Sequence, residues 1–139
     1  MPCALAYIVC LDYNPVVESD PIIERFLEDI CAAFPEIRPL MDQHEDFMTT
    51  SRMEAFATAT TLAFSRNGDP DKGKAYLEFM SRRPSCAHPE ERKYIDTYYC
   101  EHLFWQASEK AIKSGWPLVP ENLKALYLSF HGRPPGRAV

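Results

Sequence analysis

Prolines at the starts of apolar segments constrain the fold of this chain more than any other feature. The chain has 139 residues, 12 of them proline. A capping side chain followed by proline at the first helical position is a strong helix start, because that N–H has no helical partner. Starts of this kind occur at Asp20-Pro21 and Asp69-Pro70, and prolines also begin predicted helices at His88-Pro89 and at Pro120. The pattern predicts an all-α fold.

Apolar residues recur at helical spacing behind these starts, so helix lengths can be predicted. Ser51-Arg52-Met53-Glu54 matches a capping box and predicts one further start. We expect helices over residues 21–34, about 36–48, from 51 to the Asn67-Gly68 turn, 70–83, about 89–113 and 120–131. In the last helix, apolar side chains are expected to face inward, namely Leu123, Leu126, Tyr127 and Phe130.

One domain over residues 1–139 accounts for this length, which suffices to bury a core. The predicted architecture is a bundle of about six helices packed as helical hairpins. Residues 1–19 are expected to form an N-terminal arm or a short helix, and residues 133–139 a frayed tail. No segment approaches the ~18 consecutive apolar residues of a membrane span, so no membrane partner is expected.

The five cysteines are odd in number and irregularly spaced, which favours reduced core residues and a cytoplasmic location. Cys86-x-His88 and Cys100-x-His102 carry zinc-ligand types. However, residues two apart on a helix point about 200° away from each other. Core or rim placement is the preferred interpretation, and we expect no metal and no cofactor.

Charge is distributed unevenly along the chain. Residues 1–65 contain eleven carboxylates and three bases, or −8, whereas residues 66–139 contain nine carboxylates and twelve bases, or +3. An acidic half repels nucleic acid and anionic membranes and attracts a basic partner. The chain has no glycine-rich phosphate loop, no Gly-x-Ser-x-Gly elbow and no Cys-x-x-Cys pair. We therefore expect a binding protein and no enzyme.

Asp42, Glu45 and Asp46 are the first candidate binding residues. Offsets of three and four place them on one face of the predicted 36–48 helix, opposite the stripe that holds His44. They form either a solvated face or a landing site for Lys or Arg of a partner. Carboxylates of the preceding helix are candidates to extend the patch, namely Glu24, Glu28 and Asp29.

The aromatic segment 94–105 supplies the other candidates. One stripe is formed by Ile95, Tyr99 and Leu103, and a second by Tyr94, Tyr98, Glu101 and Trp105. A helix that is apolar nearly all round favours the centre of a bundle. The alternative is that Tyr98, Glu101 and Trp105 reach the surface as aromatic anchors beside a carboxylate.

Four short segments carry a resemblance: residues 26–37, 64–69, 99–103 and 118–124. They resemble a family of small all-helical bacterial proteins of the immunity type, from toxin–immunity loci, over roughly residues 21–130. The resemblance implies a non-catalytic cytosolic protein, monomeric or homodimeric, that neutralises a cognate toxin. Asp42, Glu45 and Asp46, with Tyr98 and Glu101, would then cover the basic active-site cleft of the toxin.

Two other functions are consistent with the same residues. A helical adaptor or chaperone would bind a partner peptide, and an excess of exposed aromatic over acidic side chains would favour it. A metal-dependent enzyme would use the Cys/His or carboxylate clusters, and bound zinc would favour it.

Overall fold

The computed structural model describes residues 20–83 and 87–136, and these residues form an all-helical fold. The predicted fold class is confirmed: the described part of the chain contains seven α-helices and no strand. The α-helices are α2 (Pro21–Ala33), α3 (Arg38–Met41), α4 (Thr49–Ala63), α5 (Pro70–Arg82), α6 (Pro89–Lys93), α7 (Glu109–Gly115) and α8 (Glu121–His131). The 3₁₀ turns η1 (Pro35–Ile37) and η4 (Trp116–Leu118) and the π-helix η3 (Tyr94–Cys100) lie between them.

Three of the predicted helix starts form with a capping side chain, which was expected for Asp20 and Asp69 but not for His88. Asp20 accepts the N–H of Ile22 at 2.8 Å, Asp69 accepts the N–H of Asp71 at 3.1 Å, and His88 Nδ1 accepts the N–H of Glu90 at 3.1 Å. Each of these bonds satisfies a backbone donor that the helix itself leaves without a partner. At the other end of the chain, Gly132 ends α8 with a φ of +79°, as glycine readily does.

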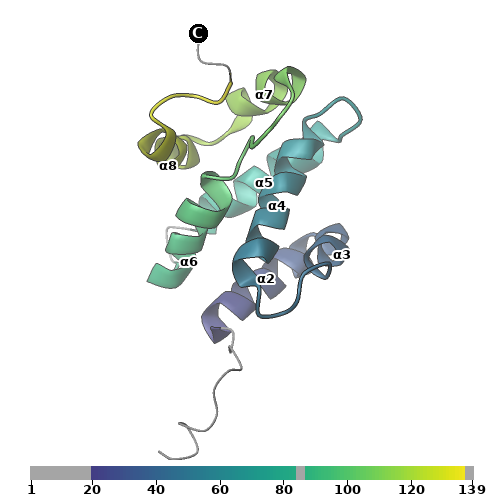
Figure 1. Ribbon diagram of the computed structural model, residues 1–139, viewed down its shortest axis with the longest axis vertical. Coiled ribbons are helices and arrows are strands. Elements are labelled where there is room, and N and C mark those ends of the chain that lie inside the picture. The colour runs from purple at the N-terminus through teal and green to yellow at the C-terminus, as the bar shows by residue number, and fades with distance from the viewer. Residues whose placement is uncertain (1–19, 84–86, 137–139) are drawn as a thin grey trace, which may run out of the picture.

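Helix α4 lies at the centre of the fold, where it contacts α2, α3, α5, α7 and η3. In Figure 1, α2 and α3 lie towards one end of α4, and α7 and α8 lie towards the other. The core on the inner side of α4 is strongly aromatic and includes Phe26, Phe56, Phe64 and Tyr99.

Two glycines allow the ring of Phe64 to pack at the junction of three helices. A Cβ on Gly73 of α5 would lie 2.6 Å from Phe64 Cζ, and one on Gly115 of α7 would lie 2.7 Å from Phe64 Cδ2. Both distances are far below a normal contact, so neither position accepts a side chain unless the buried ring moves. This close packing joins α4, α5 and α7.

The predicted helix over 36–48 is wrong in most of its length. After η1, α3 has only four residues, and the chain continues as a turn-rich loop from Asp42 to Met48. Asp and His are weak helix formers, and a tertiary bond opposes a helix here. Arg52 of α4 donates a hydrogen bond from Nη1 to the backbone oxygen of Asp46 at 3.0 Å and thereby holds the loop.

The predicted capping box at Ser51 does not form, because α4 begins two residues earlier. Met48 occupies the N-cap position and makes no side-chain capping bond. The first residue of the helix, Thr49, instead shares a hydrogen bond of 2.8 Å with the hydroxyl of Tyr94. A contact with a segment distant in sequence thus takes the place of the local cap.

The predicted helix over 89–113 is broken into three parts. Helix α6 passes into η3, a turn-rich segment 101–106 follows, and Ser108 caps the start of α7 by accepting the N–H of Ala111 at 3.1 Å. Phe104 and Gln106 have φ values of +61° and +54°, which a continuous helix excludes. The predicted stripe of Ile95, Tyr99 and Leu103 is nevertheless buried.

Phe130 was expected to face the core, and this prediction is wrong, because its side chain is 59% exposed. Leu123 and Tyr127 do face inward. The predictions for residues 1–19 and for Cys86 lie outside the described residues.

Candidate functional site

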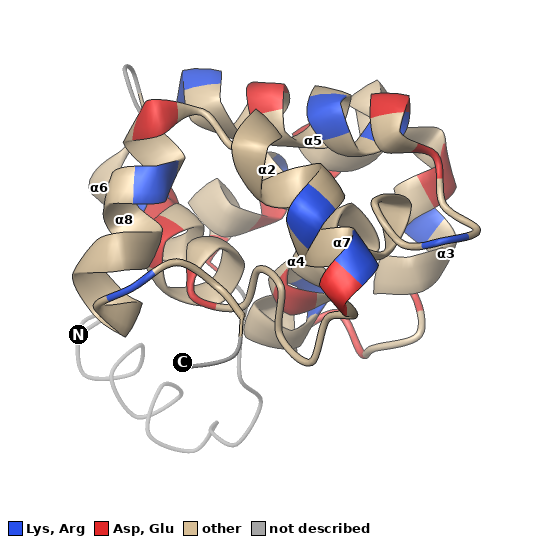
Figure 2. Ribbon diagram, turned by 90° about the horizontal axis from the view of Figure 1, so that it is seen from above, with Lys and Arg blue, Asp and Glu red and all other residues tan. Residues whose placement is uncertain are grey.

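The acidic residues Asp42, Glu45 and Asp46 all lie at the surface, but not on one helical face as predicted. Asp42 follows the last residue of α3, and the other two lie in the loop before α4. All three are exposed. The loop therefore concentrates negative charge without helical spacing (Figure 2).

The carboxylates of α2 do not extend this acidic patch, because each has a partner within the molecule. Glu24 pairs with Arg52 at 3.2 Å, Glu28 pairs with Arg38, and Asp29 pairs with Arg83 at 2.8 Å. The charge of this helix is therefore largely balanced internally.

Glu101 and Trp105 lie together at the surface, as the anchor hypothesis predicts, but Tyr98 lies apart from them. Tyr98 is half-buried and packs edge-on against Tyr94 with ring centroids 4.8 Å apart. Glu101 is half-buried, and Trp105 is 63% exposed. Both line a shallow pocket of about 340 Å³ that also has Phe130 on its wall. We call it the Trp105 pocket; its lining residues are Glu54, Thr97, Glu101, His102, Trp105, Phe130 and His131.

The backbone of residues 94–106 determines that Trp105 points outward. The wide turn of η3 ends in a hydrogen bond from the N–H of Glu101 to the oxygen of Asp96. The positive φ of Phe104 then interrupts the helical path; the ring of Phe104 is buried, and the next side chain is exposed. The N–H of Phe104 donates to Thr61 Oγ1 of α4 at 2.8 Å, which holds the turn against α4. Positive φ at a bulky residue is costly and is enriched at functional sites, as are π-helices.

The pocket is negatively charged, and one of its carboxylates is in an unfavourable environment. Burial, with a smaller contribution from the charge of Asp96, raises the pKa of Glu101, and His131 partly offsets this increase. Within the described residues, neither Glu54 nor Glu101 belongs to an ion pair. No Lys or Arg lines the pocket. The carboxylates there have no Lys or Arg partner in the described part of the chain, and His131 is the basic group whose charge acts on Glu101.

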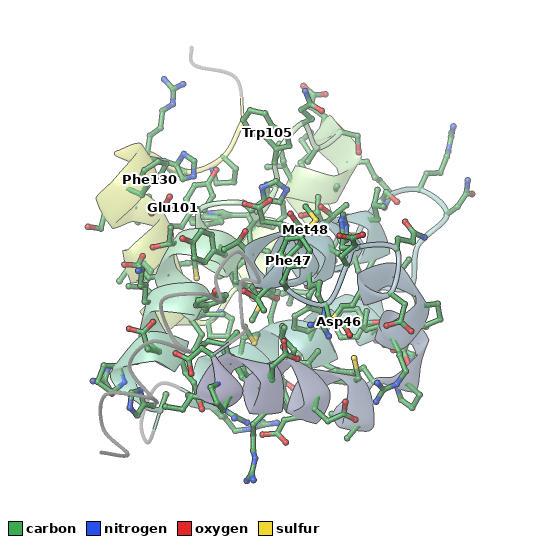
Figure 3. All side chains as sticks on the ribbon, turned by 60° about the horizontal axis from the view of Figure 1, so that its bottom comes forward. Asp46, Phe47, Met48, Glu101, Trp105 and Phe130 are labelled. Carbon is green, nitrogen blue, oxygen red and sulfur yellow. The ribbon has the colours of Figure 1, made fainter. Side chains whose placement is uncertain are left out.

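Three pockets follow the outer side of α4 and share lining residues. The Trp105 pocket shares His102 and Trp105 with a second pocket of about 250 Å³, which also has Leu62 on its wall. The second pocket shares Thr58 and Leu62 with a third, which reaches Leu40 and His44 beside the acidic loop. We call this surface, from the loop to Phe130, the α4 face. Figure 3 labels Asp46, Phe47 and Met48 at its start and Glu101, Trp105 and Phe130 at its far end.

Exposed apolar side chains are concentrated on the α4 face. Leu62 is 58% exposed and Phe47 is 47% exposed, in addition to Trp105 and Phe130. In contrast, the large apolar side chains of α2 and α5, such as Phe26 and Leu77, are buried or half-buried. An exposed apolar area bordered by charge marks an interaction surface.

Sequence reasoning missed Glu54, Leu62 and the outward position of Phe130. Glu54, Thr58 and Leu62 recur every four residues along α4, so their shared face was readable once the helix was assumed. We had assigned Glu54 to the capping box. No local sequence pattern indicates that α4, residues 101–105 and α8 come together in the fold.

Among the residues that suggested a metal centre, the described ones, His88, Cys100 and His102, form no metal site. Cys100 is fully buried, where burial raises the pKa of its thiol, whereas His102 stacks on Trp105 at the surface with ring centroids 6.2 Å apart. His88 serves as a helix cap. Residues 20–83 and 87–136 contain no group of three or more His, Cys, Asp or Glu residues arranged to hold a metal ion.

None of the described helices combines the length and the apolar character needed to cross a bilayer. No curated protein and no solved structure matches the chain. Residues 27–132 do match one protein family, and this stretch includes α4, η3, the 101–106 turn and α8. Because the match covers well over half of the sequence, the chain belongs to the family described as Domain of unknown function (DUF7674).

Proposed function

We propose that this protein is a non-catalytic binding protein that holds a basic protein partner on the α4 face. The observation that carries the proposal is the coincidence of exposed aromatic side chains with unpaired carboxylates on that face. Trp105 and Phe130 are large exposed anchors, and Glu54 and Glu101 lie beside them in the same pocket. Aromatic anchors beside charged groups are typical of the residues that dominate binding energy.

The acidic loop adds a second, longer-ranged contribution. Asp42, Glu45 and Asp46 lie at one end of the α4 face, and the chain has a formal net charge of −5. Complementary charge at the edge of an interface mainly accelerates association, whereas buried anchors mainly slow dissociation. The two ends of the face should therefore contribute to different rate constants.

The specific role we propose is immunity against a toxin. The protein would occlude the basic active-site cleft of a cognate toxin in the cell that makes both. Two arguments support this role: the acidic loop beside aromatic anchors, and the resemblance of residues 26–37, 64–69, 99–103 and 118–124 to immunity-type proteins. A toxin that acts on nucleic acid is basic, which matches an acidic inhibitor.

The test is binding to the product of the adjacent gene, followed by toxicity rescue in cells that express both. Triple neutralisation of the loop (D42N/E45Q/D46N) should lower the association rate constant about tenfold at low salt. Trp105→Ala should instead raise the dissociation rate constant. The control D71N/E78Q/E121Q removes three charges elsewhere on the surface and should leave both rate constants near the wild-type values. Failure of the protein to protect cells, or equal rates for both triple variants, would contradict the proposal.

A helical adaptor or chaperone is a second candidate, and the apolar pockets along α4 favour it. Leu62 is exposed between two of them, in a position that would suit an apolar peptide. Such a protein would bind unfolded apolar peptides with an affinity that changes little between low and high salt. The immunity proposal requires a strong dependence on salt for the basic partner, because exposed charges are screened.

A further inference from the structure

We propose that the Trp105 pocket receives an arginine side chain of the partner protein. This inference rests on the proposed function, which it deepens by naming the group that enters the pocket. We choose a guanidinium group because the walls of the pocket combine flat rings with acceptor oxygens.

The rings of the pocket come from two separate parts of the fold. Trp105 projects from the 101–106 turn and stacks on His102, with an angle of 26° between the rings. Phe130 projects from α8 and packs edge-on against His131 with centroids 4.8 Å apart. Aromatic faces attract cations, and indole does so most strongly.

The acceptors also come from two elements. Glu54 projects from α4, and Glu101 follows η3. Glu101 is the more constrained of the two, because burial and the charge of Asp96 disfavour its ionised form. A cation entering the pocket would relieve this penalty and would gain more from the partly desolvated carboxylate than from one in water.

The same molecule already binds an arginine in this way elsewhere. The guanidinium carbon of Arg83 lies 4.6 Å from the centroid of the Phe26 ring. Its nitrogens donate to Asp29 and to Glu91, each at 2.8 Å, and the two carboxylates come from different helices. The Trp105 pocket likewise places two carboxylates beside aromatic rings, and among the described residues no Lys or Arg lines it; its own basic groups are the imidazoles of His102 and His131.

Arginine fits this pocket better than lysine for a geometric reason. A planar guanidinium can stack on an indole face while its five N–H donors reach acceptors on two sides. A lysine ammonium is a strongly hydrated point charge and cannot stack. An arginine peptide should therefore bind more tightly than a lysine peptide of equal charge.

The first experiment measures peptide binding by the fluorescence of Trp105. The chain has two tryptophans, so Trp116→Phe leaves Trp105 as the only one. The probes are capped tetrapeptides of arginine, of lysine, and of citrulline, which is the uncharged isostere of arginine. We expect saturable quenching by tetra-arginine, weaker quenching by tetra-lysine and none by tetra-citrulline.

The carboxylates are tested in the same tryptophan background. E54Q/E101Q should weaken tetra-arginine binding by about fivefold or more, since it removes both acceptors. The control E78Q/E121Q removes the same charge from α5 and α8 and should bind as the parent does. Equal quenching by arginine and citrulline peptides, or equal affinities for the two double variants, would overturn the inference. Spermidine is a polyamine cation that has no guanidinium group. If it binds saturably and as tightly as tetra-arginine, the inference is also overturned.

A final comparison separates this inference from the proposed function. If tetra-arginine binds but the product of the adjacent gene does not, the pocket is an arginine site and the immunity role is wrong. If that product binds and E54Q/E101Q behaves as the control pair does, the role stands and the arginine site is wrong.

Discussion

Two sides of this molecule use the same chemical groups in opposite ways. On the side formed by α2, α5 and α6, carboxylates meet cations of the same chain, as Glu36 does with Lys72 at 3.0 Å and Glu91 with Arg83 at 2.8 Å. Charged bands of both signs follow α5 (Figure 2). On the α4 face, Glu54 and Glu101 lie beside exposed rings in a pocket that no Lys or Arg of the described residues lines.

The difference shows that the net charge of a segment is a poor guide to where unpaired charge lies on the surface. The N-terminal half is the more acidic, yet α2 contributes little free charge because Arg38, Arg52 and Arg83 neutralise its carboxylates. Binding is better predicted by groups that lack an internal partner. The side of α2, α5 and α6 should therefore determine stability, and the α4 face should determine recognition.

The largest effect on stability is expected at Arg83. Arg83→Leu removes the partner of Glu91, which is buried, and the cation above the ring of Phe26. We expect the free energy of unfolding to fall by about 3 kcal/mol, as when one member of a buried pair is removed. Chemical denaturation measures this value, and Arg25→Leu, at an exposed position of α2, is the control. If Arg83→Leu lowers the free energy of unfolding no more than Arg25→Leu does, the ion pairs of this side do not determine stability.

A smaller loss is expected at Thr61, which joins α4 to the 101–106 turn. Thr61→Val keeps the shape but removes the oxygen that accepts the N–H of Phe104 at 2.8 Å. A buried donor without a partner costs about 1–2 kcal/mol, which denaturation would measure. Thr58→Val, at an exposed position of the same helix, should have almost no effect. Similar values for the two valine variants would show that the 101–106 turn does not depend on this bond.

A small gain in stability is expected for Glu101→Gln. Because the folded protein raises the pKa of Glu101, the ionised side chain destabilises the fold at any pH above that pKa. The gain, below about 1 kcal/mol, should be larger at pH 7 than at pH 4 and should vanish well below about pH 4.3, where glutamate is protonated in the unfolded chain too. Thermal unfolding at pH 7 and pH 4 tests this sign. A loss at pH 7 would show that Glu101 has a stabilising partner.

The smallest effects on stability are expected at the exposed anchors. Trp105→Ala and Phe130→Ala should each change the free energy of unfolding by less than about 0.5 kcal/mol, because water already surrounds most of both side chains. The same variants should weaken partner binding strongly. A large loss of stability from either one would mean that the α4 face serves the fold and not a partner.

Local sequence signals predicted the ends of several helices correctly. Asp20-Pro21, Asp69-Pro70 and Gly132 act within a few residues of themselves, so the structure follows them. The fold class follows for the same reason. Where a side-chain contact competes with a local signal, the prediction was wrong: the distant Tyr94 bonds to Thr49 at the start of α4, and the nearby Arg52 holds the loop at Asp46.

The candidate site was only partly predictable. Asp42, Glu45 and Glu101 are at or near the surface, and Trp105 was among the possible anchors, because exposure follows approximately from polarity and periodicity. The pocket itself needs Phe130 from α8 and Glu54 from α4 beside the turn after η3. The contact between these three elements depends on the positive φ at Phe104, which no sequence pattern predicts.

The turn at Phe104 has a consequence for the entropy of binding. The ring of Phe104 is buried edge-on against Trp116 and Tyr127, with centroids 6.2 and 6.5 Å away, and its amide is bonded to α4. The backbone that carries Trp105 is therefore already ordered before any partner arrives. A partner need not immobilise a loop to use this anchor, so little of the interaction energy is lost to ordering. The conformational entropy of this turn is lost when the protein folds. Trp105 is therefore held in position before binding.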